Sequence, residues 1–281
     1  MLPQIRVDWR LFLLIPAICL AVGTARGEEP KSGPPTTLKE LSLEVSALQI
    51  LHHLSVTPAQ LQQFKKLAKE TKSKETDDKP GKGSDKFRNA LVEIRQALLE
   101  NKDPEEIDKL AEKLDKLREE EKPVLDDDVD MTEGARRRAP QALRLLGAPQ
   151  VAAYLSGLVG EVGDPPSLLV EALDQVRTLS ADQWKEFRAN FGDEIGRLVA
   201  GVDAEKSEKI SDEVVQLLIV ARSLKDAEFK TQRPDLEKSA LKIVGDVSPF
   251  LVLQNVMENV MATLLSNPRL SEAIDARLQK K

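Results

Sequence analysis

The stretch 103–122, DPEEIDKLAEKLDKLREEEK, carries the clearest structural signal in this chain. Asp103 is followed directly by Pro104, and a side-chain oxygen beside a proline marks a helix start. The oxygen accepts hydrogen bonds from free backbone N–H groups, and proline has a preset φ where no N–H is needed. Apolar residues then recur three or four apart, at Ile107, Leu110, Ala111, Leu114 and Leu117. All other residues from 105 to 118 are charged, which predicts an amphipathic helix from Pro104 to about Lys122.

The preceding segment, from Ser84 to Asn101, has a narrow apolar stripe of its own at Phe87, Leu91, Ile94 and Leu98. Two such helices joined by a tight turn predict an antiparallel, coiled-coil-like hairpin over residues 84–122. Because the stripe is thin, we expect this hairpin to protrude from the main body. We also expect it to present its stripe to a partner or to a second copy.

Signals for helix starts recur along the whole chain. A cap residue followed by proline occurs at Thr57-Pro58, Asp164-Pro165, Ser248-Pro249 and Asn267-Pro268. The sequence contains no alternating β-branched or aromatic run and no Asn-Gly hairpin turn. We therefore predict an all-α protein, a multi-helix array or bundle of about 10–12 helices. The further helices are expected over 38–53, 58–72, 133–146, 149–158, 167–177, 181–199, 211–225, 235–244, 249–265 and 268–278. The most apolar stretches, 214–221 and 250–265, are predicted to be the central core helices.

The segments between the helices predict the organisation of the chain. We expect a signal peptide at 1–27, a disordered lead-in at 28–36 and an all-helical domain over 37–281. Within that domain we expect a flexible lysine-rich loop at 71–86 and an acidic linker at 119–130. A break at residues 231–234 marks a candidate C-terminal subdomain over 235–281, and one continuous array is the alternative.

The N-terminal segment has the three parts of a secretory signal peptide: Arg6 and Arg10, an apolar run over 11–23, and small residues at Ala25 and Gly27. The apolar run would rise only about 20 Å as a helix, too short for a bilayer core of roughly 30 Å. We expect cleavage after Gly27, with an uncleaved anchor as the alternative. The chain has no second long apolar span, so we expect no membrane span after cleavage.

Cleavage would leave 254 residues without the single cysteine of the chain, and so without a disulfide or a thiolate metal site. It removes three basic residues and one acidic residue, so the formal net charge falls from −6 to −8. This acidic balance predicts no nucleic-acid partner. The sequence has no Asn-x-Ser/Thr site, which favours export to a bacterial periplasm or extracellular space over a eukaryotic secretory route.

A short motif occurs three times. The copies are, in the order used below, VTPAQL at 56–61, LSADQW at 179–184 and LGAPQV at 146–151, and each has an aromatic residue three positions later. In a capping box the cap oxygen accepts from the N3 amide, while the N3 glutamine accepts from the cap amide, and flanking apolar residues fix the chain entry. The predicted structural helix caps are therefore Thr57, Gln60, Gly147, Gln150, Ser180 and Gln183. Gly147 has no side chain, so only half of its box can form.

These motif copies resemble the LTxxQ family of bacterial envelope proteins, the Spy/CpxP-type periplasmic group. The resemblance implies an all-α fold, often a cradle-shaped dimer, and a role as an ATP-independent chaperone, a damper of stress signalling or a metal-stress protein. The matched residues would be structural caps. This chain is longer than the family pattern, and its acidic balance differs from the basic concave surface of the chaperone members.

The remaining polar clusters predict structure rather than chemistry. His52 and His53 are adjacent on a helix and point about 100° apart, so they cannot chelate one ion together, and we expect a packed or hydrogen-bonded role. The acidic run Asp126–Asp130 does not match an EF-hand loop and is expected at the start of the helix capped by Thr132. Arg136–Arg138 is expected to pair within the chain or to be solvated. The alternatives are a histidine metal site with distant carboxylates, loose calcium contact at the acidic run, and an anionic partner at the arginines.

No catalytic, cofactor or metal motif is present, so we expect no enzyme and no cofactor. The sequence favours an exported helical protein-binding or chaperone-like envelope protein that contacts protein partners or associates with itself. The alternatives are a structural or scaffold protein of the envelope and a metal-stress protein.

Overall fold

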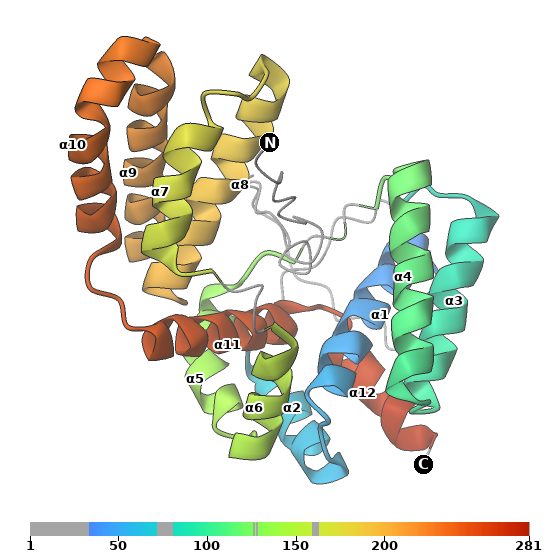
Figure 1. Cartoon of the computed structure of the whole chain (residues 1–281). Coiled ribbons are helices and arrows are strands. Elements are labelled where there is room, and N and C mark those ends of the chain that lie inside the picture. Colours follow the sequence, from blue (N-terminus) through green and yellow to red (C-terminus); the bar gives the residue numbers. More distant parts are fainter. Residues whose placement is uncertain (1–33, 72–80, 126, 128, 159–162, 281) are drawn as a thin grey trace, which may run out of the picture. The chain divides into compact units, whose positions relative to one another are not determined.

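The computed structural model describes residues 34–71, 81–125, 127, 129–158 and 163–280, and these residues form twelve α-helices and no strand (Figure 1). The predicted all-α class is therefore confirmed. The helices are α1 (Leu38–His53), α2 (Pro58–Thr71), α3 (Asp85–Leu99), α4 (Pro104–Glu121), α5 (Glu133–Leu143), α6 (Ala148–Leu158), α7 (Pro165–Gln175), α8 (Ala181–Ala200), α9 (Ala204–Ser223), α10 (Asp226–Val244), α11 (Pro249–Ser266) and α12 (Leu270–Gln279). The expected signal peptide and most of the lead-in and lysine-rich loop lie outside the described residues.

The described helices group into two compact units. One comprises residues 155–260, and the other comprises 34–154 together with 261–280. The boundary expected at 231–234 is wrong, because α10 runs continuously through Pro234. Phe229 and Leu236, on either side of this proline, are buried in the same apolar core, so tertiary packing outweighs the helix-breaking tendency of proline. The candidate subdomain over 235–281 is accordingly divided between the two units.

The unit of residues 155–260 is built around the close contact of α8 with α9. At Gly196 a Cβ atom would lie 2.5 Å from the Ser207 carbonyl oxygen, so the two helices approach closely enough to require glycine. Helix α7 packs on α8, α9 and α10, and aliphatic and phenylalanine side chains fill the space between them. Helix α9 starts earlier than the sequence predicted, because Asp203 caps it and accepts a hydrogen bond from the Lys206 amide at 3.0 Å.

In the other unit, α1 is the central helix, and it is buried on almost every side. It packs against α3 and α12, while α2 packs against α5 and α12. Helix α11, predicted as a core helix over 250–265, spans both units; nearly every residue from Val256 to Ser266 is buried, whereas Phe250 and Leu251 are exposed. The central position of α1 was not predicted.

Helices α3 and α4 form the expected antiparallel hairpin. Lys113 pairs with Glu93 at 2.6 Å, and one antiparallel bridge joins Lys82 to Val124 beyond the helix ends. The expectation that its stripe would face a partner is wrong, because α3 is packed between α4 and α1 and the apolar residues of both stripes are wholly or largely buried. The hairpin stripe is therefore part of the core.

No helix in the described part of the chain is by itself long and apolar enough to cross a membrane. Helices α10 and α11, which are bent by 59° relative to each other, reach that length and composition only as a pair.

Candidate binding surface

The first and third motif copies form their hydrogen bonds at the starts of α2 and α6. The Thr57 hydroxyl accepts from the Gln60 amide at 3.3 Å, and Gln60 Oε1 accepts from the Thr57 amide at 2.9 Å. In the third copy Gln150 Oε1 accepts from the Gly147 amide at 2.8 Å. Gly147 has no side-chain oxygen to accept from the N3 amide, so only this half of the capping box forms, as predicted.

The structure brings these two motif copies into contact with each other. Gln60 Nε2 donates to Gln150 Oε1 at 2.8 Å, and Gln150 Nε2 lies 3.1 Å from Gln60 Oε1. Each glutamine also donates to a backbone carbonyl five residues before the other: Gln60 to Leu145 at 2.7 Å and Gln150 to Ser55 at 2.9 Å. The exchange is reciprocal and ties the α1–α2 turn to the α5–α6 turn.

The second copy forms a separate capping box at the start of α8. The Ser180 hydroxyl accepts from the Gln183 amide at 3.3 Å, and Gln183 Oε1 accepts from the Ser180 amide at 2.9 Å. The Arg222 guanidinium lies 5.5 Å from the ring centre of Trp184 and donates to the Leu179 carbonyl at 2.8 Å. All six predicted cap residues thus make local or cross-turn contacts that hold the scaffold.

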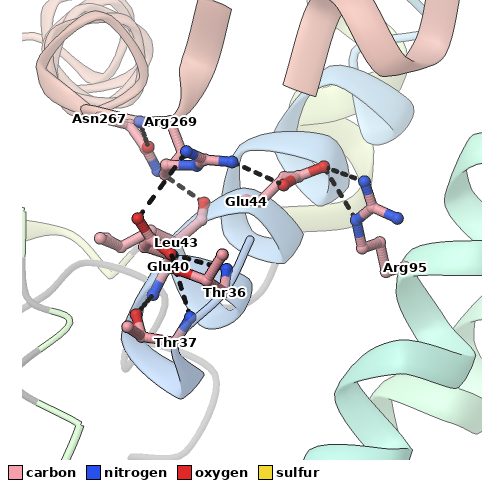
Figure 2. Close-up of polar contacts among 8 residues, drawn as sticks. All are labelled: Thr36, Thr37, Glu40, Leu43, Glu44, Arg95, Asn267 and Arg269. Atoms are coloured by element: carbon pink, nitrogen blue, oxygen red, sulfur yellow. Dashed lines mark hydrogen bonds and ion pairs between the residues drawn. The ribbon is translucent and has the colours of Figure 1, made fainter. Parts of the chain in front are cut away.

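A buried ion cluster on α1 was not predicted (Figure 2). The side chain of Glu44 is only 1% exposed, and Arg95 donates to its Oε1 through two nitrogens, at 2.8 and 2.6 Å. Arg269 Nη2 approaches the other carboxylate oxygen at 3.4 Å. Asn267 donates to the Leu43 carbonyl at 2.9 Å, so the start of α12 is fastened to α1 beside this cluster. An acidic residue among the apolar residues of α1 was the available sequence signal.

This cluster is a buried ion-pair network with a structural role. Both carboxylate oxygens of Glu44 face guanidinium groups, which is the arrangement that a buried charge requires. Because Arg95 comes from α3 and Arg269 from the start of α12, the cluster joins three elements. The neighbouring Glu40 accepts hydrogen bonds from the amides of Thr36 and Thr37 at 2.8 and 3.0 Å, which lower its pKa against an opposing effect of burial.

His52 is half-buried, as expected for a packed role, whereas His53 is exposed. The two rings meet edge to face, with centres 5.8 Å apart. Burial lowers the pKa of His52, and the nearby charges of His53 and Arg277 lower it further. Among the described residues, no group of three His, Cys, Asp or Glu side chains is placed to hold a metal ion.

The acidic run is only partly described, because Asp126 and Asp128 lie outside the described residues. Asp127 accepts hydrogen bonds from the Ser42 hydroxyl and from Arg118, the latter at 3.2 Å. The expected position of this carboxylate at the start of α5 is therefore wrong: it pairs with α1 and α4. Thr132 does cap α5, and its hydroxyl accepts from the Ala135 amide at 3.1 Å.

The arginine run pairs within the chain. Arg137 pairs with Glu133 at 2.8 Å, and Arg138 pairs with Glu70 at 3.1 Å. The partner of Arg137 lies on α5 itself and that of Arg138 on α2, so both arginines pair within the chain.

Exposed apolar side chains lie beside two hollows between α9 and α10. Two shallow, open hollows of about 390 and 420 Å³ share Glu213 and Ile243, and we call them together the α9–α10 groove. Its apolar side chains include Leu217, Val220 and Ile243, and also Val247 and Leu251 beyond the end of α10.

The groove lies on a face of α9 that no neighbouring helix covers. Val220 is 44% exposed, and Phe250, which precedes Leu251, is 76% exposed. The stretch 214–221 was predicted to be core, and Val214, Leu217, Leu218 and Ala221 are buried, whereas Ile219 and Val220 are exposed. The sequence does contain a sign of this exposed face. Residues 217–220 are four consecutive apolar residues, and these cannot all lie on a single face of a helix.

Comparisons with protein-family models, with curated proteins and with solved structures gave no match to this chain.

Proposed function

We propose that this protein is an exported, non-catalytic, protein-binding factor of the cell envelope, with a chaperone-like role, and that the α9–α10 groove is where it contacts its protein partners. The observation that carries this proposal is the exposed aliphatic lining of the groove. The described fold leaves it uncovered, and a partner would remove it from water at a gain of about 25 cal/mol per Å².

The shape of the groove favours a helical partner segment. Two helices bound an elongated depression, and amphipathic helices bind such grooves through residues spaced three and four apart. The apolar lining is bordered by charged residues of α9, including Asp212 and Glu213, which is the usual arrangement of a protein interface.

Polar contacts fasten helix ends to one another within each of the two units. The capping boxes and the Glu44 cluster fix helix ends to one another in a chain whose only cysteine lies in the expected signal peptide. Such fastening suits a protein that works outside the cell membrane without disulfides, and this supports the export proposal.

The test compares two valine substitutions of matched exposure. Val220→Asp places a charge in the groove, whereas Val92→Asp places one on α3, where the valine is 49% exposed. We expect the wild type and Val92→Asp to suppress aggregation of an unfolding client protein at stoichiometric ratios. Val220→Asp should lose that activity while its far-UV circular dichroism remains that of the wild type.

The alternative role as an envelope scaffold gives a different result. A photo-crosslinking residue at Gln216 would then capture one or two fixed neighbours in native cells, and purified protein would protect no client. If no client is protected even at a large excess and nothing is captured at Gln216, the proposed protein-binding function is wrong.

A further inference from the structure

The outer face of α9 carries charges in a particular order. Lys206 and Lys209 come first, and Asp212 and Glu213 follow one turn later. All four side chains are exposed, and none forms an ion pair with another residue of the described chain. The four lie within about 10 Å along the helix axis and line the groove. Along the edge of the groove, two lysines are therefore followed by two acidic residues, while the exposed Glu205 and Glu208 of the same helix do not line it.

This order is self-complementary under a twofold axis. If two copies of α9 meet in opposite directions with the axis near Ile210, the two lysines of each copy face the two acids of the other. A partner helix of unrelated sequence would need to carry the matching order, whereas a second copy supplies it automatically. Contacts of this kind, in which the same patch is used on both subunits, are the commonest in homo-oligomers.

Apolar side chains extend the same contact. The hollow beside Lys206 and Lys209 is lined by Ile243, Val247 and Leu251. Phe250, adjacent in sequence to Leu251, is the most exposed large apolar residue of the described chain. A twofold contact centred on this hollow would bury apolar surface of both copies. The pairs between the lysines of one copy and the acidic residues of the other would then lie at the edge of this contact.

We propose that a second copy of this chain docks antiparallel on the α9–α10 groove, with Lys206 and Lys209 of each copy facing Asp212 and Glu213 of the other. This inference rests on the proposed protein-binding role and names the partner. The exposed ion pairs are individually weak and are screened by salt, so the dimer should be of modest affinity and should weaken as ionic strength rises.

Two charge-reversal variants test the contact. Lys206→Glu with Lys209→Glu makes all four groove-lining charges acidic, and Asp212→Lys with Glu213→Lys makes all four basic. The protein is expressed with its own N-terminal segment, purified as the cell releases it, and measured by sedimentation from about 1 to about 100 μM. We expect each variant alone to self-associate at least about tenfold more weakly than the wild type, because like charges then meet. An equimolar mixture of the two should regain the mass of a dimer.

The matched control is Lys185→Glu with Arg188→Glu, which makes the same charge change at the same spacing on the exposed face of α8. It should associate like the wild type. A wild type that stays monomeric throughout, a variant that dimerises as well as the wild type, or a mixture that fails to associate would each overturn the inference.

A photo-crosslinking residue at Gln216 separates this inference from the proposed function. Capture of a second copy in the purified protein supports both. Capture only of other proteins in native cells, with a monomeric purified protein, overturns the dimer and leaves the protein-binding role in place. Capture of nothing in either setting removes both.

Discussion

Replacing Gln60 by alanine tests whether the two paired motif copies stabilise the fold as one element. The substitution removes the hydrogen bonds of the side-chain amide, among them those to the Thr57 amide, the Leu145 carbonyl and Gln150 Oε1, at 2.9, 2.7 and 2.8 Å. Each such bond contributes about 0.5–1.5 kcal/mol net, so the expected loss in the free energy of unfolding is about 2–4 kcal/mol.

The chain provides its own control in the capping box at the start of α8. Gln183→Ala removes the same reach-back hydrogen bond, to the Ser180 amide at 2.9 Å, but no cross-turn partner of Gln183 is seen among the described residues. Its expected cost is about 0.5–1.5 kcal/mol. Guanidinium unfolding followed by far-UV circular dichroism measures both values, and hydrogen exchange locates the loss at the starts of α2 and α6.

A double-mutant cycle then isolates the contact between the glutamines. Gln60→Ala and Gln150→Ala should be non-additive by about 0.5 kcal/mol or more, because each removes bonds that belong to both. Equal costs for Gln60→Ala and Gln183→Ala, together with additivity of the cycle, would refute the reasoning. The motif copies would then be independent helix caps that happen to lie side by side.

Three further substitutions test other features. Burial raises the pKa of Glu194 from 4.5 to about 7, so the folded state holds a proton that the unfolded state releases, and the free energy of unfolding should fall as pH rises from 4.5 through 7. Glu194→Gln should remove this pH dependence and stabilise the protein by up to about 3 kcal/mol above pH 7, as measured by urea titrations at several pH values. Gly196→Ala should cost about 1–3 kcal/mol despite the better helix propensity of alanine, because its Cβ would meet the Ser207 carbonyl, and thermal unfolding will show this. Gly147→Ser should be neutral or stabilising by a few tenths of a kcal/mol in the same assay, because the nearest atom to an added Cβ lies 3.6 Å away and a hydroxyl would complete the box; a clear loss would mean that the backbone requires glycine.

The Glu44 cluster affects how the stability of this fold should be interpreted. A buried ion pair stabilises little relative to apolar packing, yet removing one member leaves an uncompensated charge. Here one carboxylate serves two arginines from distant parts of the chain, so its loss would loosen α1 from both α3 and α12. The cluster thus specifies which helices meet, and apolar packing supplies most of the driving force.

The sequence by itself determined the elements that depend on neighbours within a few positions. The cap at Asp103, the box of Ser180 with Gln183 and the half box at Gly147 involve atoms two or three residues apart, so the residue types alone define the helix starts. The twelve helices follow from such signals and from apolar periodicity. The largest shifts of helix boundaries are at α9, which a missed cap at Asp203 lengthened, and at α10, which continues through Pro234.

The tertiary structure decided everything that depends on residues far apart in the chain. Gln60 meets Gln150 across 90 positions, and Glu44 meets Arg269 across 225. No local pattern encodes these pairs, because the chain must first collapse around its apolar core before the polar groups find partners. The tertiary structure also decided burial, because the apolar stripe of the hairpin is buried whereas one face of α9 is exposed. A periodic pattern predicts which side of a helix is apolar, but only the packing of the helices determines what covers that side.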